Sequence, residues 1–145
     1  MIQIFPFKYH NNFIASHAHE IRRKVFVLEQ HVQQNLEFDE HEPQCHHYLA
    51  YLDNRSVGTA RWRLTDEGAK LERIAVLPQY RNKGIGTVIV NHLIEDARAH
   101  NKTIYVTAQT FMYEFFEKMG FVLQPGEFIE AGLAHYKLIL PERQI

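Results

Sequence analysis

The stretch of this 145-residue chain best suited to chemistry is a short basic turn with two glycines, Arg81-Asn82-Lys83-Gly84-Ile85-Gly86-Thr87. Glycines let backbone amides approach a ligand without a Cβ in the way. The turn leads into an amphipathic segment, and the first amides of a helix lack intrahelical acceptors and carry partial positive charge. Together with the charges of Arg81 and Lys83, the turn predicts a site for a phosphate or pyrophosphate.

The turn differs from two common phosphate-binding motifs. No Gly-Lys-Ser/Thr follows, so it is not a Walker loop, and Ile89 stands where the dinucleotide fingerprint needs a third glycine. Because two glycines alone are a weak motif, a turn that merely begins a helix is the competing interpretation.

Two regular elements must hold the turn. Residues 71–76 are apolar enough for a buried strand, which Pro78 ends because proline cannot continue a strand ladder. After the turn, apolar residues recur at spacings of three, four and eight, which predicts a helix of about seventeen residues ending near Asn101. The apolar residues are Ile85, Val88, Ile89, Leu93 and Ala97.

Elsewhere, antiparallel strands come first and a strand–helix–strand pattern follows, which indicates one mixed α/β sheet. Asn11 or Asn12 can cap the first helix, and a hairpin turn is expected at Asp53-Asn54-Arg55. With no linker or repeat, residues 1–145 are expected to form a single domain. The other predicted strands are residues 2–7, 47–52, 56–64, 103–107, 121–123 and 135–140, and the other predicted helices are residues 13–30, 32–38 and 110–119.

Three blocks of sequence together resemble the GNAT superfamily of N-acetyltransferases. Arg81-x-x-Gly84-x-Gly86, after a strand ending in residues 74–76, is similar to its motif A, and Ala108-Gln109 with residues 115–121 (FFEKMGF) is similar to its "A…FYEKxGF" block. Residues 22–30 (RRKVFVLEQ) are similar to the "RxxVFxxEQ" block of the ElaA/YjcF-like subgroup. Glu37-x-Asp39 and residues 132–135 (GLAH) also fit that subgroup.

The resemblance implies a GNAT fold, with a single central mixed sheet of about six to seven strands flanked by about four helices. It also implies an N-acetyltransferase that moves the acetyl group of acetyl-CoA directly to a primary amine of a small molecule or peptide. The alternative is an acyl-CoA-binding module with little or no catalysis, used for sensing or interaction.

The resemblance also assigns the acetyl-CoA site. The pyrophosphate would bind the backbone amides of the turn, the pantetheine arm would pair with the exposed backbone of the strand before it, and two residues of a later helix would flank the cofactor. These residues are Ile74, Ala75, Val76, Arg81, Asn82, Lys83, Gly84, Ile85, Gly86, Thr87, Phe116 and Lys118.

Glu72 is the first candidate for the base that takes a proton from the amine, directly or through water. Related enzymes often carry an acidic residue on this strand that faces the acceptor. Strand alternation would place Glu72 on the same face as Ile74 and Val76. The other interpretation is a structural ion pair with an arginine such as Arg61 or Arg73.

The acid that protonates the leaving thiolate is harder to assign. In the superfamily it is usually a tyrosine, and Phe116, which has no proton to give, occupies that position. Tyr113 lies one turn earlier on the same predicted helix and could reach the same region. An ordinary packed aromatic is the competing reading of Tyr113, and a water could also protonate the thiolate.

Acidic residues and one histidine are candidates for the acceptor side. Glu29, Glu37 and Asp39 would suit a cationic amine, and His135 either lines the acceptor pocket or caps the core. The ten histidines show no spacing typical of a zinc site, so no metal is expected. Cys45 has no readable histidine and carboxylate framing, so it is not expected to act as a nucleophile.

Composition narrows the class of protein and its surroundings. A net charge of −1 favours neither nucleic acid nor an anionic membrane. A single cysteine fits a reducing compartment, and the sequence has no apolar run of membrane-spanning length and no signal pattern. We therefore expect a cytoplasmic protein, and the resemblance implies a small-molecule amine as its partner. The oligomeric state stays open, with a homodimer as one option.

Overall fold

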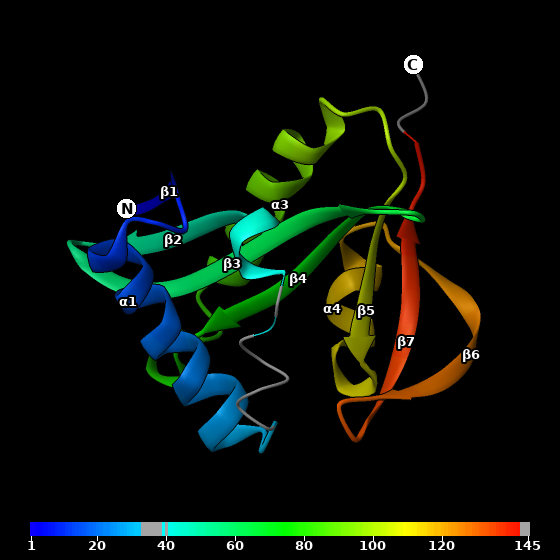
Figure 1. Cartoon of the computed structure of the whole chain (residues 1–145). Helices are drawn as coiled ribbons and strands as arrows, with labels where there is room; N and C mark the ends of the chain where they lie inside the picture. Colours follow the sequence, from blue (N-terminus) through cyan, green and yellow to red (C-terminus); the bar gives the residue numbers. More distant parts are fainter. Residues whose placement is uncertain (33–38, 40, 143–145) are drawn as a thin grey trace.

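The structure, a computed structural model, describes residues 1–32, 39 and 41–142. In this part of the chain seven strands form one mixed sheet in the order β1-β2-β3-β4-β5-β7-β6 (Figure 1). Only β4 and β5 pair in parallel. The predicted mixed sheet is confirmed, with the strands β1 (Ile2–Phe7), β2 (His46–Leu52), β3 (Arg55–Thr65), β4 (Gly68–Val76), β5 (Ile104–Gln109), β6 (Val122–Glu130) and β7 (Leu133–Leu140).

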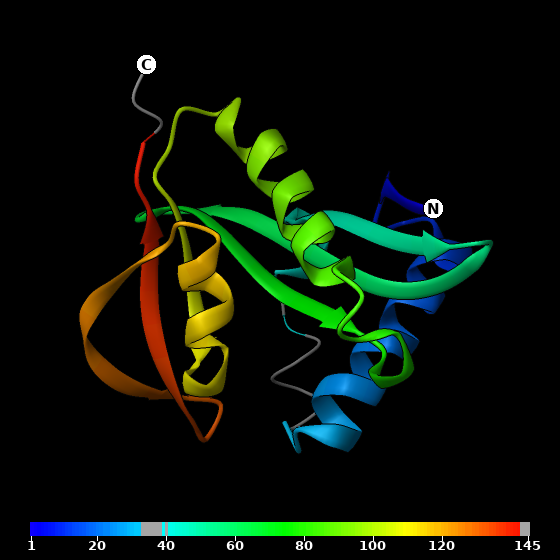
Figure 2. The same cartoon turned by 180° about the vertical axis from the view of Figure 1, so that it is seen from behind.

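Helices cover both faces of the sheet. One face carries α1 (Asn12–Arg22), which continues as the π-helical segment η1 (Arg23–Glu29). The opposite face carries α3 (Ile85–Arg98) and α4 (Tyr113–Lys118), as the view from behind shows (Figure 2). These are the three α-helices of the described residues, against about four expected, and the helix predicted over residues 32–38 lies largely outside them.

Short 3-10 turns complete the connections: η2 (Glu42–Gln44), η3 (Pro78–Tyr80) and η4 (Thr110–Met112). The predicted turn residues behave largely as expected. The Asn11 side chain accepts a hydrogen bond from the Ile14 amide at 3.3 Å and so caps α1. Asp53 and Asn54, with φ of 49° and 71°, form a two-residue hairpin turn, and Asn101, with φ of 53°, follows α3 as a left-handed stop.

Apolar side chains fill both layers. The larger cluster lies between the sheet and the helices α3 and α4, and a smaller one lies between the sheet and α1. Val88 was predicted on the buried face of α3 but is 39% exposed. The buried stripe is centred further round the helix, because Val90 and Ile94 belong to it.

The pairing between β4 and β5 is short, and this opens the sheet. Its register consists of Ala69 with Ile104 and Lys70 with Tyr105. Beyond these pairs the two strands separate (Figures 1 and 2). The β4 backbone from residue 71 to residue 76 therefore has no β5 partner, as pairing with a pantetheine arm would require.

A β-bulge interrupts β4 at the point where the strands separate. Thr59 of β3 pairs with Ala75, and Arg61 pairs with Glu72, so one residue of β3 lies opposite two of β4. One of the two is Arg73, whose φ of 53° is unusual for a residue with a side chain.

The bulge changes which way Glu72 faces. An extra residue in a strand shifts the alternation of side chains beyond it. Ile74 and Val76 pack against the core on the α3 side, whereas Glu72 contacts Arg61, whose own partner Glu42 is bound by Arg22 of α1. The prediction that Glu72 shares a face with Ile74 and Val76 is therefore wrong, because alternation was counted through the bulge.

Candidate active site

The predicted pyrophosphate turn is an open, uncapped helix beginning. Gly84 precedes α3 with a left-handed φ of 78°, and a Cβ built there would meet no atom within 4 Å. No side chain caps the first amides of this 14-residue helix. These amides therefore keep their hydrogen-bonding capacity for a ligand, and the helix dipole favours an anion there.

Gly86 brings the beginning of α3 close to the next helix. A Cβ built on Gly86 would lie 3.5 Å from the ring of Phe115 on α4, an ordinary van der Waals contact. Phe115 also packs against Phe116 with ring centroids 5.0 Å apart. The α3 N-terminus and α4 thus lie side by side on one face of the sheet (Figure 2).

Arg81 braces the turn. Its Nε donates to the Val76 carbonyl at 2.9 Å, and its two terminal nitrogens donate to the Glu29 carboxylate at 2.6 and 2.7 Å. This bidentate bond lowers the pKa of Glu29. Glu29, predicted on the acceptor side, is thus placed at the turn, where it offsets the charge of Arg81. Lys83 is exposed and lies 5.9 Å from the centroid of the Tyr80 ring.

A cavity of about 390 Å³ opens where β4 and β5 separate, and η1 contributes to its wall. Of the predicted residues, Ile74, Glu72, Asp39, His135 and Phe116 line it. Tyr113, Glu29 and Lys118 are not among the lining residues. The cavity therefore joins the exposed β4 backbone to most of the predicted acceptor side.

Glu72 is the centre of a buried ion cluster. Its carboxylate lies 2.9 Å from Arg61 Nη2, 2.8 Å from Arg63 Nε and 3.4 Å from Lys70 Nζ. Arg73 Nη1 is 3.9 Å away. Burial alone would raise the pKa of Glu72, but the charges of its four partners, Arg61 foremost, outweigh this effect and lower it. The contacts match the structural interpretation of Glu72.

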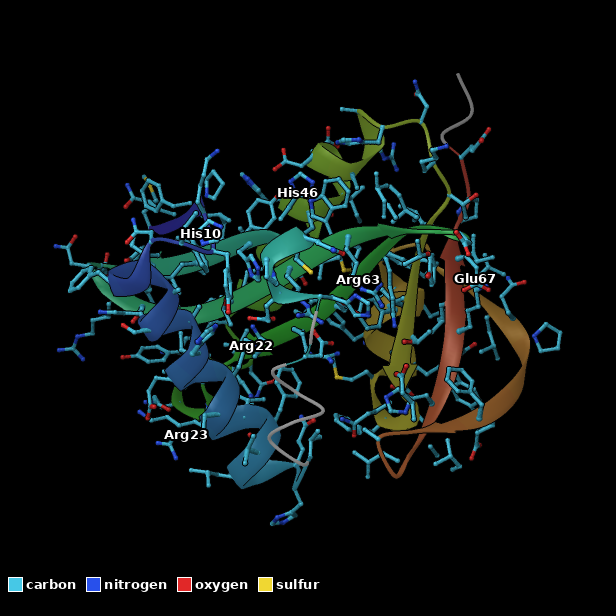
Figure 3. All side chains as sticks on the ribbon, viewed as in Figure 1. His10, Arg22, Arg23, His46, Arg63 and Glu67 are labelled. Atoms are coloured by element: carbon cyan, nitrogen blue, oxygen red, sulfur yellow. The ribbon has the colours of Figure 1, made fainter. Side chains whose placement is uncertain are left out.

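Two further carboxylates extend the cluster to α1. Arg61 also contacts Glu42 and donates to Asp39 at 2.9 Å, and Arg22 contacts Glu42 at 2.9 Å. Arg22 lies between α1 and the sheet, whereas Arg23 lies on the outer side of the helix (Figure 3). Asp39, predicted near the acceptor, lines the cavity but is already bound by arginine.

His135 enters the cavity from β7. Its Nδ1 lies 2.8 Å from the Leu133 carbonyl, and a carbonyl oxygen can only accept, so Nδ1 carries the proton. Nε2 is then the nitrogen that can gain or lose a proton, and it lies 3.5 Å from the Glu130 carboxylate. The ring also stacks on Phe128. A fixed tautomer facing a cavity suits proton transfer.

The two aromatic candidates for the acid position differ. Phe116 is buried and lines the cavity, so the place of the usual tyrosine is filled by a ring without a proton. The Tyr113 hydroxyl donates to Glu117, and its ring meets Tyr136 at 5.9 Å. This hydrogen bond raises the pKa of Tyr113. The contacts favour the interpretation of Tyr113 as a packed aromatic.

Nucleophile and metal chemistry find little support in the described residues. The Cys45 thiol donates to the His41 carbonyl, does not line the cavity, and has a pKa raised to about 11 by burial. No group of three or more histidine, cysteine or acidic side chains is placed to hold a metal ion in the described part of the chain. No helix there is long and apolar enough to cross a membrane.

Sequence reasoning missed the basic lining of the cavity. Arg63 and Lys70 line it from β3 and β4, and Glu42 of η2 binds Arg61. The alternation Arg61-x-Arg63 on β3 and Lys70-x-Glu72 on β4 was the available signal. Charged residues at every second position of otherwise apolar strands indicate one polar face inside the fold.

Comparison with known proteins places the chain in a family. The acetyltransferase (GNAT) family model matches residues 13–121. The chain is 43% identical over 122 residues to YyaT of Bacillus subtilis, covering 81% of this chain and 82% of that protein. It is 37% identical over 124 residues to YjcF of the same organism, described as an uncharacterized N-acetyltransferase, covering 84% of this chain and 89% of that protein.

Solved structures agree on the fold. Escherichia coli ElaA superposes with a TM-score of 0.84 at 21% identity, covering 97% of this chain and all of that one. A Bacillus subtilis acetyltransferase in complex with CoA gives 0.73 at 18% identity, covering 99% and 100%. An Elizabethkingia anophelis GNAT acetyltransferase with acetyl-CoA bound gives 0.67 at 19%, covering 95% and 94%. The predicted resemblance, including its ElaA/YjcF-like subgroup, is thus confirmed, and the chain belongs to the GNAT family of acetyltransferases.

Proposed function

We propose that the protein is an acetyl-CoA-dependent N-acetyltransferase that moves the acetyl group directly to a primary amine. The observation that carries this proposal is the convergence of two features at one opening of the sheet. The edge of β4 that lacks a β5 partner leads from the uncapped beginning of α3, and the cavity meets that same strand at Ile74. A thioester held along β4 would present its carbonyl to an amine in the cavity.

The cofactor half fits acetyl-CoA without a built-in metal. The amides at the beginning of α3 can receive the pyrophosphate. Lys83 adds a positive charge nearby that no carboxylate among the described residues neutralises. Residues 74–76 offer backbone groups for the amides of the pantetheine arm. Two relatives by fold are described with CoA or acetyl-CoA bound, which supports the same ligand here.

His135 is the best-placed base. The acceptor amine must lose a proton before it can attack, and His135 lines the cavity with its tautomer fixed by the Leu133 carbonyl. Glu72 also lines the cavity and stays a candidate, but its four cationic partners stabilise the ionised carboxylate and weaken it as a base. The thiolate would then take its proton from water, because Phe116 cannot supply one.

Direct transfer is favoured over an acetylated enzyme. The chain has one cysteine, and burial keeps its thiol protonated at neutral pH. The second candidate function is a CoA-binding module with little catalysis, and the observation that favours it is Phe116 at the acid position. Activity measurements separate the two.

The test is the acceptor-dependent release of CoA thiol from acetyl-CoA in a broad screen of amines. We expect transfer to at least one amine, and His135→Gln should lower kcat by about 10²-fold, as for loss of a general base. Tyr113→Phe is the matched control and should change kcat less than about twofold, because its hydroxyl points to Glu117.

CoA affinity should stay the same in both variants, which separates chemistry from binding. Binding of CoA without any acceptor, including in a Phe116→Tyr variant, would favour the binding module. A normal kcat in His135→Gln would remove the base role, and a large loss in Tyr113→Phe would return the acid role to Tyr113.

A further inference from the structure

Three basic side chains stand in the cavity wall beside three carboxylates. Arg63 of β3 pairs directly with Lys70 of β4, and Arg73 follows three residues later in β4. Arg63 extends from β3 on the side of the sheet that carries α1 (Figure 3). The three side chains are 20%, 13% and 22% exposed, so they are neither fully buried nor free in solvent.

Among the described lining residues, the three carboxylates Asp39, Glu72 and Glu130 equal these cations in number, but they are shared with further cations. Glu72 alone is surrounded by four cations within 3.9 Å, and one of them, Arg61, also holds Asp39. Glu42 is matched by Arg22 on α1. Glu130, at 41% exposure, is the most exposed of the described lining carboxylates and stands at the edge of the cavity. The described wall is therefore close to neutral, and its carboxylates are shared among several cations.

Lys70 retains hydrogen-bonding capacity. Its ammonium has three donors, yet it lies 3.4 Å from Glu72 and 3.7 Å from Glu130, longer than the roughly 2.7–2.9 Å of a strong charge-assisted bond. Arg63 donates its Nε to Glu72, and a guanidinium has four further N–H donors. Both residues can thus receive an additional oxyanion.

Glu130 connects this wall to His135. One of its oxygens is 3.7 Å from Lys70 Nζ, and the other is 3.5 Å from His135 Nε2. An acidic group bound at Lys70 would therefore be separated from the proposed base, His135, by the Glu130 carboxylate. An amine on a short chain from that acidic group would reach His135 and Glu130.

We infer that the acceptor is a small amine that also carries an acidic group, a carboxylate or a phosphate, which binds at Lys70 and Arg63. The inference rests on the proposed function and names its substrate class. It replaces the expectation of a purely cationic amine, because Glu29 is engaged at the turn by Arg81 and Asp39 is held by two arginines.

The first experiment compares matched acceptors that differ only in the acidic group. The pairs are phenylalanine with phenethylamine, lysine with cadaverine, and phosphoethanolamine with ethanolamine. We expect kcat/KM to be about tenfold or more higher for the acidic member of at least one pair, as one or two charge-assisted hydrogen bonds would give. The amino acid and phosphate pairs show which oxyanion is preferred.

The second experiment changes the wall. Lys70→Met keeps the packing of the aliphatic stem and should raise the acceptor KM about tenfold or more, while CoA affinity stays unchanged. Lys70→Arg should restore binding, and Lys70→Glu should shift preference to the amine without the acid. Lys137→Met is the control, because Lys137 pairs with Glu67 outside the cavity lining.

The outcomes separate this inference from the proposed function. Equal kcat/KM for both members of every pair, or an unchanged acceptor KM in Lys70→Met, would overturn the inference and leave transferase activity standing. CoA binding with no transfer to any amine would overturn both. A preference for the acidic member that Lys70→Met abolishes and Lys70→Arg restores would support both.

Discussion

The two halves of the proposed site differ in whether backbone groups or side chains form them. The cofactor half consists mainly of backbone: an uncapped helix beginning, a left-handed glycine and a strand edge without a partner. The acceptor half consists of side chains, with Arg61, Glu72 and Glu42 buried and held to one another. In the proposed function, the first half would bind any ligand with the same phosphates, whereas the second would determine which acceptor is used.

This difference has an energetic side. Backbone amides at a helix beginning are exposed to water, so leaving them unbound costs little. Buried ions are costly unless each keeps its partners. Single substitutions in the acceptor half should therefore lower the stability of the fold, whereas substitutions in the cofactor half should mainly weaken ligand binding.

The largest expected effect comes from breaking the buried cluster. Arg61→Met removes the shared partner of Asp39, Glu42 and Glu72 and leaves uncompensated buried charge. We expect the free energy of unfolding to fall by about 3–5 kcal/mol, as for other broken buried pairs. Denaturant unfolding followed by circular dichroism measures this loss.

The control for Arg61→Met is Arg23→Gln, which removes an exposed pair with Glu20 on the outer side of the helix. Its unfolding midpoint should match that of the parent protein. The CoA affinity of Arg61→Met, measured at a temperature where the variant is folded, should also match that of the parent protein. A loss of CoA affinity without a loss of stability would show that the two halves are not distinct in this way.

A smaller effect is expected from acid. The pKa values of Glu42, Glu72 and Asp39 are lowered in the folded protein, because hydrogen bonds and charges outweigh the effect of burial: those of His19 and Arg22 for Glu42, and those of Arg61 foremost for Glu72 and Asp39. Carboxylates with a lowered pKa stabilise the fold above their ordinary values, about 4, and this contribution is lost as the pH falls through the lowered values. The urea midpoint should hold from pH 7 to about pH 5 and then fall.

Two substitutions sharpen the acid experiment. Glu72→Gln removes a titrating member of the cluster and should make the decline below pH 5 shallower. Glu29→Gln, on the cofactor half, removes a carboxylate that is largely exposed and should change the profile little. Equal flattening in both variants would contradict a special role for the buried cluster.

Local patterns were enough to predict most of the fold and the cofactor half. The glycines and basic residues of the turn are contiguous in the sequence, and the apolar repeat of α3 follows directly. The binding turn and the helix after it can therefore be predicted from one stretch of sequence. The strand before the turn was also predicted from a contiguous stretch of sequence. Asn101 and Gly120 also stand at the left-handed positions that end helices.

The acceptor half depends on contacts between distant parts of the chain, which explains why it was harder to predict. Arg22, Glu42 and Arg61 meet across three separate elements. The bulge at Arg73 turned Glu72 to the other face, and no glycine or proline marks it in the sequence. His135 was found through resemblance, but its fixed tautomer depends on the Leu133 carbonyl.

The most direct test of the central claim, that acetyl-CoA binds the backbone at the beginning of α3, is calorimetric titration of CoA into Gly86→Asp and Gly84→Asp. Both sites have room for a side chain, and aspartate is favourable at a helix beginning and tolerated in the left-handed region. Both variants should therefore fold, and the corresponding asparagine variants control for bulk.

The account predicts that the aspartate variants fold, with a lower melting temperature for Gly84→Asp because of the left-handed backbone there. Both should bind CoA about 100-fold more weakly or not at all, because a carboxylate would stand where the phosphates bind. The asparagine variants should lose less. Unchanged CoA affinity in both aspartate variants would contradict the assignment of the pyrophosphate to this turn.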